Sequence, residues 1–219
     1  MKSLLLKDLY NISYNVKYTL VVLIFLGLVF VPTSGPIPYM AMCAVFCSLM
    51  IFTTFTLDNA CGWTSYALVL PVSRSRLVLA KYAALAVFCT VGILFGLAAS
   101  SLGSYLIFGG VPGLVEMLVG GMLPGWAMAF AMGSTIIPLV YRFGTEKARI
   151  LFYAVCIIPV LAALIVAVLL TKTSLAAVAS AVLPYSVRGV LCSVSPLAAL
   201  AWGAVMYRVA CGVFAKAEC

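Results

Sequence analysis

Long apolar runs alternate with short polar segments along the whole chain. The first apolar run extends from Tyr18 to Leu57 without a charged residue, and a run of about 40 residues suffices for two membrane-spanning helices. A cluster of turn-forming residues interrupts it near its middle: Pro32, Gly35, Pro36 and Pro38. We therefore predict spans over residues 18–31 and 38–56, joined by a tight turn.

The later apolar runs predict four more spans, over residues 82–108, 114–141, 150–170 and 189–207. We expect Pro124 to kink the fourth of the six spans. The apolar segment between Lys172 and Arg188 is too short to cross a bilayer, so we expect a short exterior helix over residues 174–183. The pattern predicts an all-α integral membrane protein, with residues 1–219 forming a single transmembrane domain of six helices.

The first 17 residues have the pattern of an amphipathic helix. Leu5, Leu9, Ile12 and Val16 form one apolar stripe, and the charged residues lie mostly away from it. This pattern predicts an interfacial helix over residues 1–17. We do not expect a cleaved signal peptide, because no small-residue cleavage site follows the apolar run after Lys17.

A polar segment, Asp58 to Tyr82, separates the second and third predicted spans. Within it, Trp63, Tyr66, Ala67 and Leu70 have the i, i+3, i+4, i+7 spacing of one helix face. We predict a short amphipathic helix over residues 59–70. It ends at Pro71, which has no N–H to donate and disfavours helical geometry in the residue before it.

Three cations, Arg74, Arg76 and Lys81, crowd the start of the next predicted helix. Cations at a helix N-terminus oppose the helix dipole, so another interaction must favour them. One interpretation is that they hold the loop on the cytoplasmic side of the membrane. The other is that the amphipathic helix and its basic flank dock a partner protein, which also accounts for Trp63 and Tyr66.

The run Trp63-x-x-Tyr66-Ala-Leu-x-Leu-Pro-Val-Ser-Arg74, followed by Leu-Val-Leu-Ala-Lys-Tyr82, resembles the first cytoplasmic loop of small permeases of type-2 ABC exporters. It is most similar to the subgroup that includes the phenol-soluble-modulin and antimicrobial-peptide exporters. Elsewhere the similarity is limited to the pattern of six spans and a charged N-terminal helix beginning at Leu4.

The resemblance implies that the helix over residues 59–70 is a coupling helix that docks a cytosolic ABC ATPase. The residues implied in ATPase docking are Trp63, Tyr66, Ala67, Leu70, Pro71, Arg74 and Arg76. The N-terminal helix and the loop from Arg142 to Arg149 would contribute to the same contact. It further implies a homodimer of this chain, ATP and Mg bound by the partner ATPase, and an amphipathic or hydrophobic peptide as cargo.

The composition excludes a soluble protein, because 66% of the 219 residues are hydrophobic and only 8% are charged. The cations separate apolar spans instead of forming one basic stripe, so we do not expect nucleic-acid binding. Eleven of the 13 Lys and Arg residues fall on one side of the predicted topology, and only Lys172 and Arg188 on the other. The positive-inside rule therefore predicts a membrane protein with both termini in the cytoplasm. The resemblance implies that the membrane is the bacterial cell membrane.

Catalytic and metal-binding motifs are missing from the sequence. The chain has no His, no G-x-x-x-x-G-K-[ST] or G-x-G-x-x-G nucleotide motif, and eight scattered cysteines without a C-x-x-C pair. We therefore expect no catalytic residue, no bound cofactor and no metal site. Any ATP must be hydrolysed by a separate chain.

Small residues recur every four positions on two predicted helices: Gly92, Gly96, Ser100 and Ser104 on the third, and Gly121, Gly125, Ala129 and Gly133 on the fourth. Such stripes allow close helix packing, and we favour packing within one subunit over a pore or dimer seam. Glu116 is the only acidic residue predicted outside. It either suits the headgroup zone and the helix dipole or guides substrate at the exit.

Together these features predict a transmembrane permease subunit of an ATP-driven bacterial exporter. The alternative is an ATP-independent secondary transporter or channel. Such proteins commonly place ionisable residues or broken helices at the middle of the membrane. No ionisable residue falls at the middle of any predicted span, which counts against ion coupling. A structural assembly factor remains a third interpretation.

Overall fold

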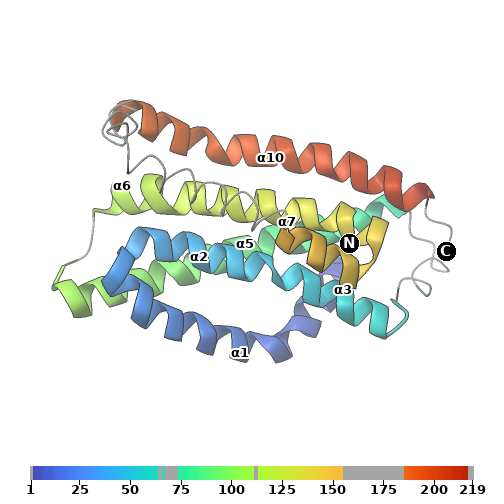
Figure 1. Cartoon of the computed structure of the whole chain (residues 1–219), viewed down its shortest axis with the longest axis horizontal. Coiled ribbons are helices and arrows are strands. Elements are labelled where there is room, and N and C mark those ends of the chain that lie inside the picture. Colours follow the sequence, from blue (N-terminus) through green and yellow to red (C-terminus); the bar gives the residue numbers. More distant parts are fainter. Residues whose placement is uncertain (1, 64–65, 67–73, 111–112, 155–184, 217–219) are drawn as a thin grey trace.

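Long helices lying side by side make up the structure, a computed structural model that describes residues 2–63, 66, 74–110, 113–154 and 185–216 (Figure 1). Every regular element within these residues is helical. The elements are α1 (Lys2–Ser34), α2 (Pro36–Ser48), α3 (Met50–Ala60), α5 (Arg74–Phe108), α6 (Leu114–Glu116), the π-helix η1 (Met117–Met122), α7 (Leu123–Phe143) and α10 (Tyr185–Lys216). Residues 145–154 are also helical.

Within the described residues, five helical stretches are long and apolar enough to cross a membrane: Val16–Ser34, Pro36–Ala60, Ser75–Ile107, Met117–Phe143 and Cys192–Phe214. They correspond to the first four predicted spans and to the sixth. Most of the predicted fifth span, 150–170, and all of the predicted exterior helix, 174–183, lie outside the described residues. The chain is therefore a multi-pass membrane protein, and the count of six spans stays a prediction.

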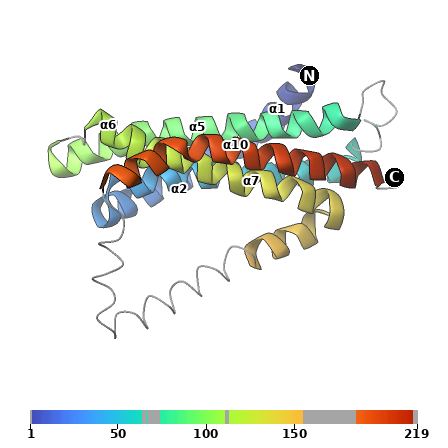
Figure 2. The same cartoon turned by 90° about the horizontal axis from the view of Figure 1, so that it is seen from above.

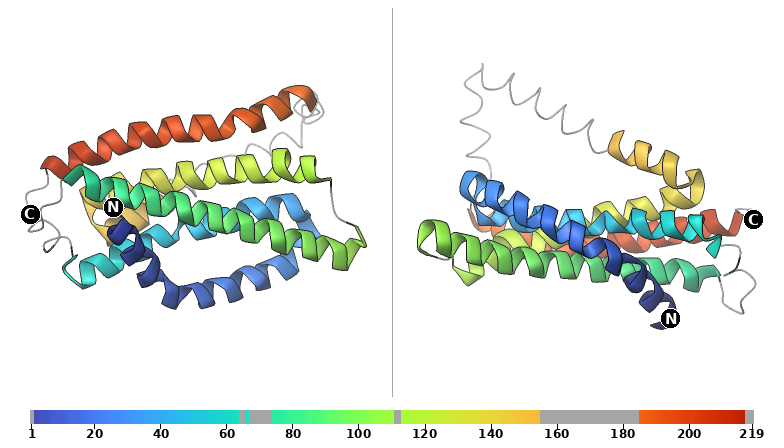
Figure 3. Two further views of the ribbon diagram at one scale, coloured as in Figure 1. Left: turned by 180° about the vertical axis from the view of Figure 1, so that it is seen from behind. Right: turned by 90° about the horizontal axis from the view of Figure 1, so that it is seen from below.

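Helix α1 combines the predicted interfacial helix and the first span in one continuous element. Its first part runs at an angle to the rest, as the dark blue end of the ribbon shows in Figure 3. The start of α1 and the end of α10 lie at the same end of the bundle, which we call the terminal end (Figure 1). The helix over residues 145–154 turns back from α7 at this end (Figure 2), where Gly144 has a φ of +78°.

Helix α2 lies at the centre of the bundle and packs against both α5 and α7. Glycines on α5 and α7 make this approach close. A Cβ added at Gly96 would lie 3.0 Å from the Met40 Cα, and one at Gly125 would lie 3.0 Å from the Ala41 Cα. Helices α1 and α10 lie on opposite sides of this centre (Figures 1 and 3). Backbone proximity of this kind replaces the hydrophobic driving force that is weak inside a bilayer.

The fourth predicted span contains an irregular turn at a position other than the expected one. We expected a kink at Pro124, but Pro124 lies in the first turn of α7 and the irregular segment is the π-helix Met117–Met122 just before it. Pro124 has no N–H to donate to the carbonyl of Gly120, four residues earlier. The regular α-helical pattern is therefore interrupted at this point, and the wider π turns occupy the preceding residues.

Replacing Gly92 by Ala should destabilise the bundle by about 1–3 kcal/mol, the usual range for overpacking a filled interior. The added Cβ would lie 2.6 Å from the Cys47 Cβ and 2.9 Å from the Cys43 carbonyl oxygen. Thermal unfolding of the purified protein in detergent measures the effect. Gly212→Ala on α10 is the matched control, since its added Cβ would meet no atom of the described residues within 4 Å apart from its own turn of helix. Equal unfolding temperatures for the two variants would contradict the packing described here.

Candidate functional site

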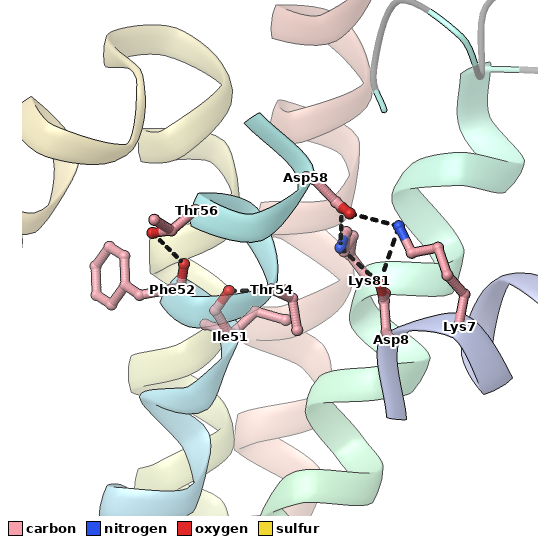
Figure 4. A network of polar contacts seen from close by, with 8 residues as sticks. All are labelled: Lys7, Asp8, Ile51, Phe52, Thr54, Thr56, Asp58 and Lys81. Carbon is pink, nitrogen blue, oxygen red and sulfur yellow. Dashed lines mark hydrogen bonds and ion pairs between the residues drawn. The ribbon is translucent and has the colours of Figure 1, made fainter. Parts of the chain in front are cut away.

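Four charged side chains from three helices meet at the terminal end of the bundle (Figure 4). Lys7 and Asp8 come from the beginning of α1, Asp58 from the end of α3, and Lys81 from the second turn of α5. We call these residues the ionic quartet. The side chains of Asp8, Asp58 and Lys81 are 3%, 6% and 9% exposed, whereas that of Lys7 is 22% exposed.

Each lysine of the quartet contacts both carboxylates. Lys81 Nζ lies 2.6 Å from an oxygen of Asp58 and 3.0 Å from one of Asp8. Lys7 Nζ lies 2.5 Å from Asp58 Oδ1 and 3.3 Å from Asp8 Oδ1. Two positive and two negative charges balance locally. The balance matters because an unpaired charge in an apolar bundle is strongly destabilising.

The quartet borders a cavity of about 40 Å³, large enough for a few water molecules at most. Side chains from every long helix except α2 line it. Besides the quartet and Trp63, the lining residues are Phe55, Leu77, Ala80, Tyr141 and Phe214. Because Tyr141 belongs to α7 and Phe214 to α10, the quartet lies where α1, α3, α5, α7 and α10 converge.

Trp63 and Tyr66 connect the quartet to the predicted coupling helix. The Trp63 ring centroid lies 4.2 Å from Lys7 Nζ, a cation–π contact. The Tyr66 ring lies 5.6 Å from the Trp63 ring, and Tyr66 is 60% exposed. One aromatic residue of the pair thus packs on the ionic quartet, and the other faces outward.

The remaining predicted docking residues are only partly described. Ala67, Leu70 and Pro71 lie outside the described residues. Arg74 begins α5, and Arg76 is exposed. Lys81 was grouped with these arginines by sequence as part of a basic flank, but its buried side chain pairs instead with Asp8 and Asp58.

The loop from Arg142 to Arg149 also contacts this region. Asn59 Nδ2 donates to Thr145 Oγ1 at 3.3 Å, and the Arg149 guanidinium donates to Thr56 Oγ1 at 3.3 Å. The same guanidinium lies 5.9 Å from the Phe52 ring centroid. Residues of α3 therefore hold this second loop beside the segment that carries Trp63.

The other predicted residues lie away from the terminal site. All five glycines singled out by sequence face neighbouring helices of the same chain: Gly92 and Gly96 face α2, Gly121 faces Met40 and Ile37, Gly125 faces Ala41 and Ile93, and Gly133 faces Leu85. Glu116 is exposed at the end of α6. Among the described residues no group of three or more His, Cys, Asp or Glu could hold a metal ion.

A second cavity, of about 170 Å³, lies between α1 and the helices α2, α3 and α5. Its lining is apolar apart from the hydroxyl of Thr19, which lies 3.8 Å from the Met50 sulfur, and the thiol of Cys47. The lining residues are Leu9, Ile12, Val16, Thr19, Leu20, Leu23, Cys47, Met50, Phe88, Val91 and Phe95. This cavity offers hydrophobic contacts at the level of the membrane-spanning segments.

Sequence reasoning did not find the ionic quartet. The available signal was the small number of acidic residues: the chain has only five. Asp58 directly follows the second predicted span, and Asp8 lies in the helix predicted at the membrane interface. Acidic residues in such positions are expensive unless paired. The pairing itself joins residues 51 and 73 positions apart, so no local pattern reveals it.

Comparison with known proteins agrees with this architecture. The family model described as ABC-2 family transporter protein matches residues 3–215, and the chain belongs to this family. It is therefore the membrane permease subunit of an ABC transporter, which works with an ATPase subunit. No curated protein and no solved structure matches the chain significantly.

Replacing Asp58 by Asn should destabilise the protein by about 3–5 kcal/mol, because it leaves two lysines facing only Asp8. Adding Lys7→Met to Asp58→Asn restores local neutrality, so the double variant should be more stable than Asp58→Asn alone. Thermal or denaturant unfolding in detergent gives the stability of the wild type, of Asp58→Asn and of the double variant. Glu146→Gln, at an exposed position, is the control and should change stability by no more than about 0.5 kcal/mol. Additive losses in the double variant would contradict the pairing of Lys7 with Asp58.

Proposed function

We propose that this chain is the permease subunit of a bacterial exporter and docks its cytosolic ATPase through the segment that carries Trp63 and Tyr66. The terminal end of the bundle would then face the cytoplasm, as the distribution of Lys and Arg predicts. The observation that carries the proposal is the division of roles in the aromatic pair. Trp63 contacts Lys7 of the ionic quartet, and Tyr66 is exposed, so that its ring is free to contact a partner.

The quartet supplies a mechanical path from the docking segment into the membrane. ATP-driven movement of the ATPase would displace Trp63, and Trp63 contacts Lys7. Lys7 and Lys81 bind the same two carboxylates, so the displacement reaches α1, α3 and α5 together. Packing around the cavity extends it to α7 and α10. In this way a movement at the surface changes the packing of the whole bundle.

A homodimer fits the packing of the described helices. The spanning part of α1 is only 11% buried and that of α10 only 22%, against 44% for α2 with α3 and 56% for Met117–Phe143. The apolar outer faces of α1 and α10 are therefore left to lipid and to a second copy of the chain. Two copies would form the substrate path between them and bind two ATPase subunits.

The proposed cargo is an amphipathic or hydrophobic peptide. The apolar cavity between α1 and α5 supports this class, because its lining offers apolar contact and almost no hydrogen-bonding groups. A sugar or an ion would need polar partners for its lost hydration. Family membership also favours transport driven by an ATPase over the ATP-independent alternative.

Replacing Tyr66 by Ala should weaken ATPase binding about thirtyfold, on the scale of about 2 kcal/mol for an aromatic interface anchor. Tyr66 is a cleaner test than Trp63, because Trp63 also contacts Lys7 within the chain. The affinity is measured by titrating the purified permease in lipid nanodiscs with its ATPase subunit. Tyr105→Ala is the matched control, since Tyr105 is 63% exposed near the opposite end of α5.

Tyr66→Ala should leave the unfolding temperature of the isolated permease unchanged. An unchanged ATPase affinity in this variant would exclude Tyr66 as an anchor. If Trp63→Ala also bound the ATPase normally, the aromatic pair would have only an interfacial role.

Inside-out vesicles that contain the permease and its ATPase subunit should take up a fluorescent amphipathic helical peptide only when ATP is supplied. A labelled disaccharide, which lacks an apolar face, should remain outside. Leu20→Trp reduces the volume of the apolar cavity and should lower peptide uptake without lowering ATPase affinity. Uptake of the disaccharide at the rate of the peptide would contradict the proposed cargo class.

A further inference from the structure

The two lysines of the ionic quartet have different surroundings, and we infer that they have different roles. Lys81 is a fixed link between α5 and the two carboxylates. Lys7 is a positioning residue whose contacts with Trp63 and Asp58 are released together when the ATPase moves the docking segment. This inference rests on the proposed function, because it describes how docking is transmitted to α1.

Burial separates the two lysines. The side chain of Lys81 is 9% exposed and that of Lys7 is 22% exposed. Lys81 also has the Phe55 ring 4.9 Å from its ammonium, so an aromatic ring covers part of the surface through which it would regain water. The ammonium of Lys7 regains water through its exposed side when its protein contacts break. Only Lys7 can therefore leave the quartet at a modest cost in desolvated charge.

The Nζ atom of Lys7 contacts both the segment that carries Trp63 and the end of α3, through Asp58. Its Nζ atom lies 4.2 Å from the Trp63 ring centroid and 2.5 Å from Asp58 Oδ1. An ammonium has three N–H donors and no acceptor, so one group serves the indole face, Asp58 and Asp8 at once. Pulling Trp63 away removes one attraction and opens the remaining side of Lys7 to water. The contact with Asp58, which joins α1 to α3, weakens as a consequence.

Release of Lys7 leaves the quartet with one excess negative charge. Asp8 and Asp58 then share Lys81 alone, at 3.0 and 2.6 Å. The two carboxylates repel each other more strongly, and Asp8 is on α1, whose spanning part is the least buried of the five spans that the structure describes. Helix α1 is therefore the element that moves most readily. Return of Trp63 brings back Lys7 and restores the neutral arrangement.

The link between Lys7 and Trp63 can be measured in the isolated permease. Replacing Trp126 and Trp202 by Phe leaves Trp63 as the single fluorescent indole of the three in the chain. Loss of the cation–π contact in Lys7→Met should raise quenching of Trp63 by acrylamide about two- to fivefold. Lys7→Arg keeps a cation that stacks on aromatic rings and should preserve the original quenching. Lys17→Met is the control, because the Lys17 ammonium contacts Tyr18.

Transmission to α1 is tested in the complex with the ATPase subunit. Spin labels at Leu6→Cys on α1 and Leu79→Cys on α5, both exposed positions, report the separation of the two helix ends in a background without native cysteines. With Lys7 present, a non-hydrolysable ATP analogue should change this separation. In Lys7→Met the ATPase should still bind and the separation should stay constant, and Lys7→Arg should restore the change.

A second variant distinguishes a lost response of α1 from misfolding. Lys7→Met combined with Asp8→Asn keeps the quartet neutral, and it should fold normally yet still lose the response of α1. A normal response in either variant, or a constant separation in the wild type with the ATPase bound, would overturn the role of Lys7. Failure of the wild type to bind any ATPase through Tyr66 would instead refute the docking proposal. The quenching of Trp63 in the isolated permease would still test its contact with Lys7.

Discussion

The pairing of four charges, three of them buried, is the interaction on which the terminal end of this bundle depends. Lys7, Asp8, Asp58 and Lys81 come from three helices, and none of the buried members can be left unpaired at low cost. The correct placement of each of the helices α1, α3 and α5 therefore depends on the other two. The apolar residues around the quartet reinforce this requirement, because they exclude water and strengthen every electrostatic interaction inside.

The membrane-spanning part depends on a different principle. Lipid surrounds the helices, so burial of apolar surface gives little preference for one helix arrangement over another. Close backbone approach at Gly96 and Gly125 gives α2 its central place between α5 and α7. In the described residues, the spanning helices thus pack closely at glycines, and the ionic quartet links three helices at the terminal end.

Much of the fold could be predicted from the sequence, because apolar runs and turn clusters are local signals. The described spans follow the predicted ones, and the sequence singled out Trp63 and Tyr66, of which Tyr66 is exposed and Trp63 contacts Lys7. The ionic quartet could not be predicted, since Asp8 and Lys81 are 73 positions apart and periodicity carries no distances. The amphipathic pattern of the first helix even suggested that Asp8 faces water. The sequence predicted a kink at Pro124, but the irregular segment is the π-helix just before it. A proline marks where a helix is disturbed, and its position alone does not show that the preceding residues adopt π geometry.

The π-helix Met117–Met122 has a consequence for how the far end of the bundle is oriented. One residue corresponds to a rotation of about 100° around a regular α-helix. The wide turns absorb residues that a regular helix would have used to rotate further, so they decide the direction in which Val115 and Glu116 point relative to α7. Converting the wide turns to regular α-helix would swing these side chains around the axis while α7 stayed in place. The π-helix therefore sets the orientation of the exposed residues before it relative to α7.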